Sequence, residues 1–85
     1  MRRSRFHLYL QILEICCEPS RKTWIVYKLN SNFREVGRML RVLLNSGYLL
    51  ENEGKYFVTK RGLNAVRYFS HAYREYPELT PQIGG

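Results

Sequence analysis

Three arginines stand at helical spacing near the middle of the chain. Arg34, Arg38 and Arg41 follow one another at intervals of four and three residues, so a helix would project all three guanidinium groups from one face. The other face would carry an apolar stripe of Phe33, Val36, Leu40, Leu43 and Leu44. A DNA major groove accepts a helix that is packed along one side and cationic along the other. An ordinary solvated helix can show the same spacing, so the rest of the sequence has to decide between the two.

The sequence contains no group of residues that suggests catalysis or metal binding. It has no paired carboxylates, no nucleophile beside a base and no glycine-rich phosphate loop. Cys16 and Cys17 are adjacent, a spacing that strains a disulfide, and His7 and His71 lie far from one another in sequence. We therefore predict no enzymatic activity, no cofactor, no metal and no small-molecule ligand. We interpret the cysteines as one buried and one half-exposed thiol.

Length and charge limit the class of protein. A chain of 85 residues forms one small domain, and dimerisation would add to its limited core. The 14 Lys and Arg residues against 7 Asp and Glu residues give a net charge of +7, which favours nucleic acid as a partner and an anionic membrane surface second. No apolar run approaches the ~18 residues of a membrane span, and the segment behind the basic N-terminus lacks the features of a signal peptide. We expect a cytoplasmic protein.

The first half of the chain predicts two helices before the arginine-bearing one. Ser4 would cap a first helix that continues to about Glu18, where Pro19 ends it. Ser20 would cap a second helix over residues 21–29, with a short strand around Lys22-Thr23 just before the helix as the alternative.

A tight polar turn and a change of period follow. Residues 30–32, Asn-Ser-Asn, form the turn, and the arginine-bearing helix covers about residues 32–46, with Gly47 as its left-handed cap. The period then changes from about 3.6 to 2, which predicts a hairpin over residues 48–58 with Gly54 supplying a positive φ.

Thr59 would cap a last helix over about residues 60–76, and residues 77–85 read as a flexible tail. The order of helix, helix, turn, helix, hairpin and long helix is that of a winged helix-turn-helix. We therefore predict a single α+β domain, mostly α, over residues 1–76.

Particular residues also resemble a known family. The stretch Lys22-Thr-Trp-Ile-Val-Tyr-Lys28, followed by Asn30, Asn32 and Phe33, resembles the archaeal winged-helix family typified by small basic chromatin proteins and related archaeal and viral regulators. Leu43-Leu44-x-x-Gly47-x-Leu49 and Tyr56-x-x-Thr59-x-x-Gly62 are similar to the joints on either side of its wing. The chain departs from the family at Trp24, where a basic residue is usual, and at Ser31, where leucine is frequent. The resemblance implies a DNA-binding homodimer in which the last helix is the dimerisation helix. Such a protein would be associated with the nucleoid or, if it is viral, would act in the cytoplasm of the host cell.

In a winged helix the N-terminal half of the third helix faces the base edges. We predict DNA contacts at Arg21, Lys22, Thr23, Lys28, Ser31, Asn32, Arg34, Glu35, Arg38, Arg41 and Lys55. Arg34 and Arg38 would read bases or contact phosphate, and Asn32 would cap the helix or read adenine. Glu35 would pair with Arg38. The basic residues Arg2, Arg3 and Arg5 would form a minor-groove arm or only add solubility.

Apolar residues of the first and last helices predict a dimer contact. They are Phe6, Leu63, Val66, Phe69 and Tyr73, and the alternative is that they close the core of the monomer. We interpret Trp24 as a core residue, with phosphate-side packing or a dimer contact as the alternatives.

Together these features favour a homodimeric transcription regulator that binds double-stranded DNA by inserting the helix at residues 32–46 into the major groove. A chromatin-type protein that coats DNA without specificity and a winged-helix protein-interaction module remain as alternatives. An RNA or membrane-surface binder is a third.

Overall fold

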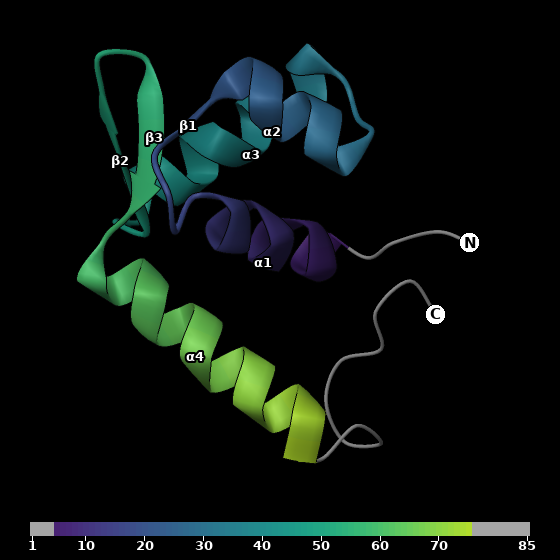
Figure 1. Ribbon diagram of the computed structural model, residues 1–85, viewed down its shortest axis with the longest axis vertical. Coiled ribbons are helices and arrows are strands. Elements are labelled where there is room, and N and C mark those ends of the chain that lie inside the picture. The colour runs from purple at the N-terminus through teal and green to yellow at the C-terminus, as the bar shows by residue number, and fades with distance from the viewer. Residues whose placement is uncertain (1–4, 76–85) are drawn as a thin grey trace.

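The computed structural model describes residues 5–75 and contains four helices and a small sheet. In chain order the elements are α1 (Arg5–Ile15), β1 (Ser20–Arg21), α2 (Lys22–Leu29), α3 (Phe33–Asn45), β2 (Leu49–Asn52), β3 (Lys55–Val58) and α4 (Lys60–Glu75). The sheet stands at one end of the molecule, and α4 starts beneath it and runs below α1 (Figure 1). This confirms the predicted α+β, mostly helical winged-helix fold. The expected cap at Ser4, the arm residues Arg2 and Arg3, and the tail at residues 77–85 lie outside the described residues.

The core lies where α1, α2 and α3 meet, and β2 closes one end. Its buried side chains are Ile12, Leu13, Cys16, Ile25, Leu29, Val36, Met39, Leu40, Leu43 and Leu49. Each helix contributes residues at intervals of three or four, because only one face of a surface helix can enter the core. The expectation that α3 packs through an apolar stripe is therefore confirmed for Val36, Leu40 and Leu43.

Two aromatic residues that the sequence analysis placed inside are exposed. Phe33 is 52% exposed and Trp24 is 49% exposed, so both interpretations were wrong. Ile25 and Leu29 fill the buried face of α2, which leaves Trp24 on the outer face, where its ring stacks on Tyr27 with the ring centroids 5.7 Å apart. Aromatic side chains have a strong tendency toward burial, but the helix face that packs is set by all the residues around it.

The sheet has the strand order β1-β3-β2 and is antiparallel throughout. Asn52 pairs with Lys55, so Glu53 and Gly54 form a two-residue turn, and both have positive φ angles, 53° and 79°. Positive φ at both central positions is the backbone of a type I′ turn, whose twist matches that of the two strands. The positive φ predicted at Gly54 is confirmed, whereas that of Glu53 was not foreseen.

The start of α2 differs from the prediction. The helix begins at Lys22, and its cap residue Arg21 makes no side-chain cap hydrogen bond. A short strand does precede it, but at Ser20–Arg21 rather than at Lys22-Thr23, where the alternative placed it. The Ser20 hydroxyl donates instead to the carbonyl oxygens of Glu18 and Ile15, at 2.9 Å and 3.3 Å. It satisfies the carbonyl group of the last residue of α1 and one just after the helix, which stops at Ile15 rather than near Glu18.

Two capping arrangements fix how α3, the hairpin and α4 join. Gly47 has φ +80°, its N–H donates to Leu44, and the next N–H, of Tyr48, donates to Leu43, which together make a Schellman end for α3. The Thr59 hydroxyl oxygen accepts from the Gly62 N–H at 3.1 Å, and the hydroxyl donates to the Gly47 carbonyl at 2.6 Å. Thr59 therefore caps α4, as predicted, and also ties α4 to the end of α3.

Candidate nucleic-acid interface

The start of α3 is fixed by a local cap. The Asn32 side chain accepts a hydrogen bond from the Glu35 N–H at 2.8 Å, which satisfies one of the donors left free at a helix start. Of the two roles predicted for Asn32, the structure has it as the cap. Glu35 lies in the first turn, where the helix dipole favours a negative charge.

The three arginines of α3 are all exposed on the side of the helix away from the core. The buried residues Val36, Met39, Leu40 and Leu43 define the packed side, and Arg34, Arg38 and Arg41 project from the opposite one. Within residues 5–75, none of these guanidinium groups forms an ion pair or a side-chain hydrogen bond. Three exposed positive charges along one helix face, without a partner in the described part of the chain, are therefore open to an anionic partner.

The ion pair expected between Glu35 and Arg38 does not form among the described residues. Both side chains line a surface pocket of about 310 Å³ between α1 and α3, together with Arg5 and Tyr9. An exposed pair on a helix contributes only about 0.3–0.5 kcal/mol and costs side-chain freedom, so solvent competes with it easily. The exposed Arg5 brings another positive charge beside α3.

Lys22 belongs to α2 but its ammonium group lies on α3. Its Nζ is 5.5 Å from the centre of the Phe33 ring. The same nitrogen lies beside Gly37, where an added Cβ would be 2.9 Å away from it. The missing side chain at Gly37 leaves the space through which Lys22 reaches the exposed side of α3.

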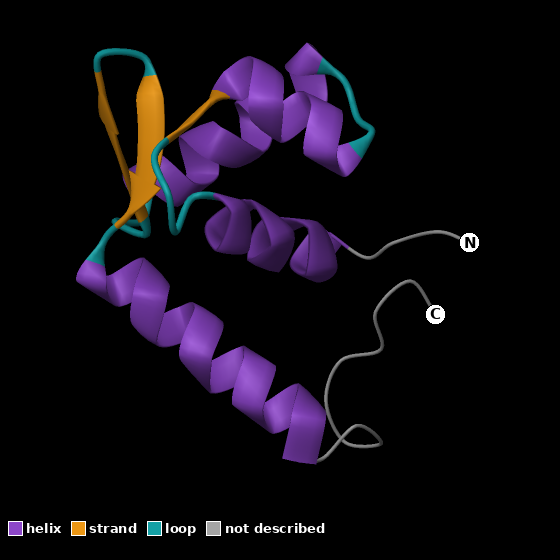
Figure 2. Ribbon diagram, in the orientation of Figure 1, coloured by secondary structure: helices purple, strands orange, loops and turns teal. Residues whose placement is uncertain are grey.

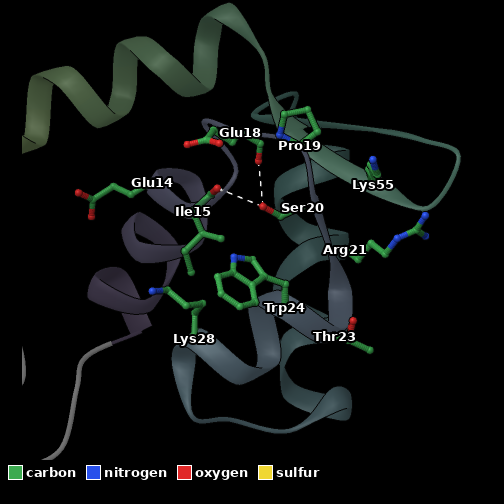
Figure 3. A pocket seen from close by; sticks show the side chains of 10 residues that line it. All are labelled: Glu14, Ile15, Glu18, Pro19, Ser20, Arg21, Thr23, Trp24, Lys28 and Lys55. Atoms are coloured by element: carbon green, nitrogen blue, oxygen red, sulfur yellow. Dashed lines mark hydrogen bonds between the residues drawn. The ribbon is translucent and has the colours of Figure 1, made fainter.

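The other predicted DNA contacts gather around a cleft on a different part of the surface. Arg21, Thr23, Lys28 and Lys55 line an open cleft of about 550 Å³ between the end of α1, β1, α2 and β3 (Figure 3). Arg21 pairs with Lys55 across the two strands. Figure 3 shows these two side chains on one side of the cleft, with Glu14 and Glu18 on the other and the Trp24 ring between them. The Lys28 Nζ lies 5.4 Å from the Trp24 ring.

This cleft carries both signs of charge. Arg21, Lys28 and Lys55 are cationic, but the carboxylates Glu14 and Glu18 share the rim. Neither glutamate was among the predicted site residues, although each stands within a few residues of the end of α1. Phosphate would be attracted to the side of Arg21 and Lys55 and repelled at the other side.

The remaining site predictions concern α1 and α4. The rings of Phe6 and Phe69 meet edge to face with centroids 4.9 Å apart, and Val66 packs against the core. Some of the apolar residues predicted for the dimer contact therefore pack within the monomer, which was the alternative to the dimer. Leu63, Val66 and Phe69 stay partly exposed, and the side chain of Tyr73 is not among those described.

The cysteines suit a structural role. Burial, with a smaller contribution from Cys17, raises the pKa of the Cys16 thiol to about 12, whereas Cys17 is exposed. A thiol that stays protonated is a poor nucleophile and metal ligand. Among the residues that the structure describes, no group of three or more His, Cys, Asp or Glu side chains could hold a metal ion.

A family model described as a winged helix-turn-helix matches residues 2–76 of the sequence. The chain belongs to this winged helix-turn-helix family. Among solved structures, the crystal structure of T. acidophilum IdeR is similar, with a TM-score of 0.72 at 20% sequence identity over 87% of this chain. The alignment covers 37% of that chain, so this protein spans little more than a third of its length, and at this identity the likeness shows the fold alone. None of the curated proteins is similar enough in sequence to count as a relative.

In a winged helix-turn-helix, α2 and α3 form the helix-turn-helix and the β2–β3 hairpin is the wing (Figure 2). Membership of this family supports DNA binding and fits a non-enzymatic role. The turn between α2 and α3 is held by Asn30, which has φ 54°, and by the Ser31 N–H, which donates to Val26 at 3.1 Å. Ser31 is therefore part of the turn that sets the angle of α3. None of the helices in the described part of the chain is long and apolar enough to cross a membrane.

Proposed function

We propose that this protein is a homodimeric transcription regulator that binds double-stranded DNA by inserting α3 into the major groove. The observation that carries the proposal is the row of Arg34, Arg38 and Arg41, exposed on α3 and without internal ion pairs among residues 5–75. The net charge of +7 adds attraction to DNA at longer range, and the family supports DNA binding.

The contacts follow from the position of each residue along α3. Arg34 and Arg38 lie in the part of the helix that approaches base edges, where an arginine can pair with guanine O6 and N7. Arg41 lies one turn further and contacts the backbone. Lys22 and Thr23, at the start of α2, contact phosphates on one side of the groove, and Arg21 and Lys55 contact phosphates beside the wing.

Salt titration tests this proposal directly. Wild type, the double variant Arg34→Ala Arg38→Ala, and Arg67→Ala, which removes an exposed arginine of α4, are titrated against duplex DNA at several salt concentrations. Each phosphate contact contributes about −0.9 to the slope of log affinity against log salt. We expect the double variant to bind more weakly with a shallower slope, whereas Arg67→Ala keeps a slope near that of wild type. Equal binding by all three proteins would exclude α3 as the contact.

The proposed dimer joins α1 and α4 of the two copies. An apolar hollow of about 300 Å³ opens between α1, α3 and α4, and Phe6, Leu10, Ala65 and Phe69 are among its lining residues. With 16 residues, α4 spans roughly 24 Å, enough for about two heptads of contact with its mate. Sedimentation equilibrium tests the dimer: Phe69→Glu should give a monomer, whereas Asn64→Glu, at an exposed position of the same helix, serves as the control.

The proposed regulator would recognise a particular DNA sequence, whereas a chromatin-type protein would coat DNA of any sequence. Selection of bound sequences from a random duplex pool distinguishes the two, because a regulator enriches a site related by two-fold symmetry. If no sequence were enriched among the bound duplexes, a chromatin-type protein would be favoured instead.

A protein-interaction module is the second candidate, and the exposed aromatic pair on α2 favours it. Trp24 and Tyr27 are 49% and 73% exposed and stack on one another on the outer face of this helix. Large exposed aromatic side chains are enriched at protein–protein contacts. Weak duplex binding without sequence preference, which Arg34→Ala Arg38→Ala leaves unchanged, would favour this candidate over DNA regulation.

A further inference from the structure

An aromatic ring stands exposed at the start of the cationic helix. Phe33 is the first residue of α3 and 52% exposed, next to Arg34 in sequence. The Asn32 cap fixes where the helix starts and therefore the direction in which Phe33 projects. Val36 and Leu40, which lie one and two turns further along α3, are fully or almost fully buried although Phe33 is exposed. Electrostatic attraction to phosphate does not require an apolar ring at this position.

The ring is held by a neighbouring cation rather than by the core. The Lys22 Nζ lies 5.5 Å from the ring centre, a distance at which an ammonium group is attracted to an aromatic face. Lys22 can reach the ring because Gly37, one turn after Phe33, has no side chain, and a Cβ there would lie 2.9 Å from that nitrogen. Glycine lowers the stability of a helix interior, so a glycine at this position of α3 calls for a reason. The space that the Lys22 side chain occupies beside Gly37 supplies one.

We propose that Phe33 reads the C5-methyl group of a thymine in the major groove, while Lys22 orients the ring and contacts a phosphate next to that thymine. This inference rests on the proposed insertion of α3 into DNA. Among the four bases, thymine alone presents an apolar group in the major groove, and phenylalanine is a side chain that packs against it. The start of α3 is the end of the helix that comes nearest to base edges.

The experiment compares duplexes that differ only in that methyl group. One random-sequence duplex pool is synthesised with thymine and the same pool with uracil, which lacks the methyl and keeps the same hydrogen-bonding groups. Wild type should bind the thymine pool about fourfold more tightly for each methyl contact made, the value that follows from burying one methyl-sized group. Phe33→Ala should lose this preference, and Phe33→Leu, which keeps an apolar side chain, should retain part of it.

A control variant removes an exposed aromatic side chain from another helix. Tyr27→Ala takes away a ring that is 73% exposed on the outer face of α2, and it should keep the full preference for thymine. Circular dichroism checks that each variant has the helix content of wild type.

Equal binding of the thymine and uracil pools by wild type would overturn the inference, while DNA binding by α3 would stand. Survival of the preference in Phe33→Ala would also overturn it, because another residue would then read the methyl. If wild type bound neither pool, both the inference and the proposed function would fail.

Discussion

One added methyl group should have opposite effects at two glycines of this protein. In Gly37→Ala the new Cβ meets the Nζ of Lys22 at 2.9 Å, and that atom is the far end of a flexible side chain that can swing away. In Gly62→Ala the new Cβ would run into the backbone carbonyl of Tyr48, which cannot move without shifting the joint between the wing and α4.

The magnitudes follow from these neighbours. Alanine is favoured over glycine in a helix interior by about 0.8–1.0 kcal/mol, and displacing Lys22 from Phe33 gives up roughly 0.5 kcal/mol of cation–π attraction at an exposed site. Gly37→Ala should therefore stabilise the fold by about 0.5 kcal/mol, which raises Tm by roughly 2–4 °C in a domain of this size. Gly62→Ala forces an overpacked contact that costs about 1–3 kcal/mol, so Tm should fall by at least about 4 °C.

Thermal melts followed by circular dichroism measure both effects, and duplex titration adds a second readout. Gly37→Ala should weaken DNA binding, because Lys22 no longer lies on the exposed side of α3. The slope of log affinity against log salt should become shallower by up to ~0.9, the contribution of one phosphate contact. In a Lys22→Ala background, the same glycine substitution should give the full gain in stability and no further change in binding. A lower Tm for Gly37→Ala would refute the reasoning, since it would mean that α2 and α3 need direct backbone contact at this position.

Further predictions concern the joint, the core and the buried thiol. Thr59→Ala removes both the cap of α4 and the hydrogen bond to Gly47, and it should cost about 1–2 kcal/mol in urea unfolding, with Thr59→Ser close to wild type. Leu40→Ala, at a position only 2% exposed, should cost about 2–5 kcal/mol in the same assay, and a loss under 1 kcal/mol would contradict the assigned core. Cys17 should react with a thiol reagent at pH 8 in the native protein, and Cys16 only after unfolding. Burial raises the pKa of Cys16 from 9.0 to about 12, so the unfolded chain loses the proton first. The contribution of Cys16 to stability is therefore complete below about pH 9 and lost between pH 9 and 12; Cys16→Ala should remove that part of the pH dependence.

The features that the sequence determined by itself are those set by residues within a few positions of one another. The period of the apolar residues in α3 and the spacing of its three arginines are enough to place the arginines on the outer face. The helix ends at Asn32, Gly47 and Thr59 could likewise be predicted, because each cap is made by groups that lie near the helix terminus. The order of these elements was then sufficient to predict the winged helix-turn-helix fold.

The tertiary structure decided which of several possible faces and partners each side chain has. Phe33 and Trp24 are apolar enough for the core, but other residues already fill it, so both rings remain exposed. The pairing of Arg21 with Lys55 joins segments far apart in the chain, and the space at Gly37 that admits Lys22 exists only once α2 lies against α3. Propensity and period act along the chain, whereas the occupancy of a core and the neighbours of a charge depend on segments that only folding brings together.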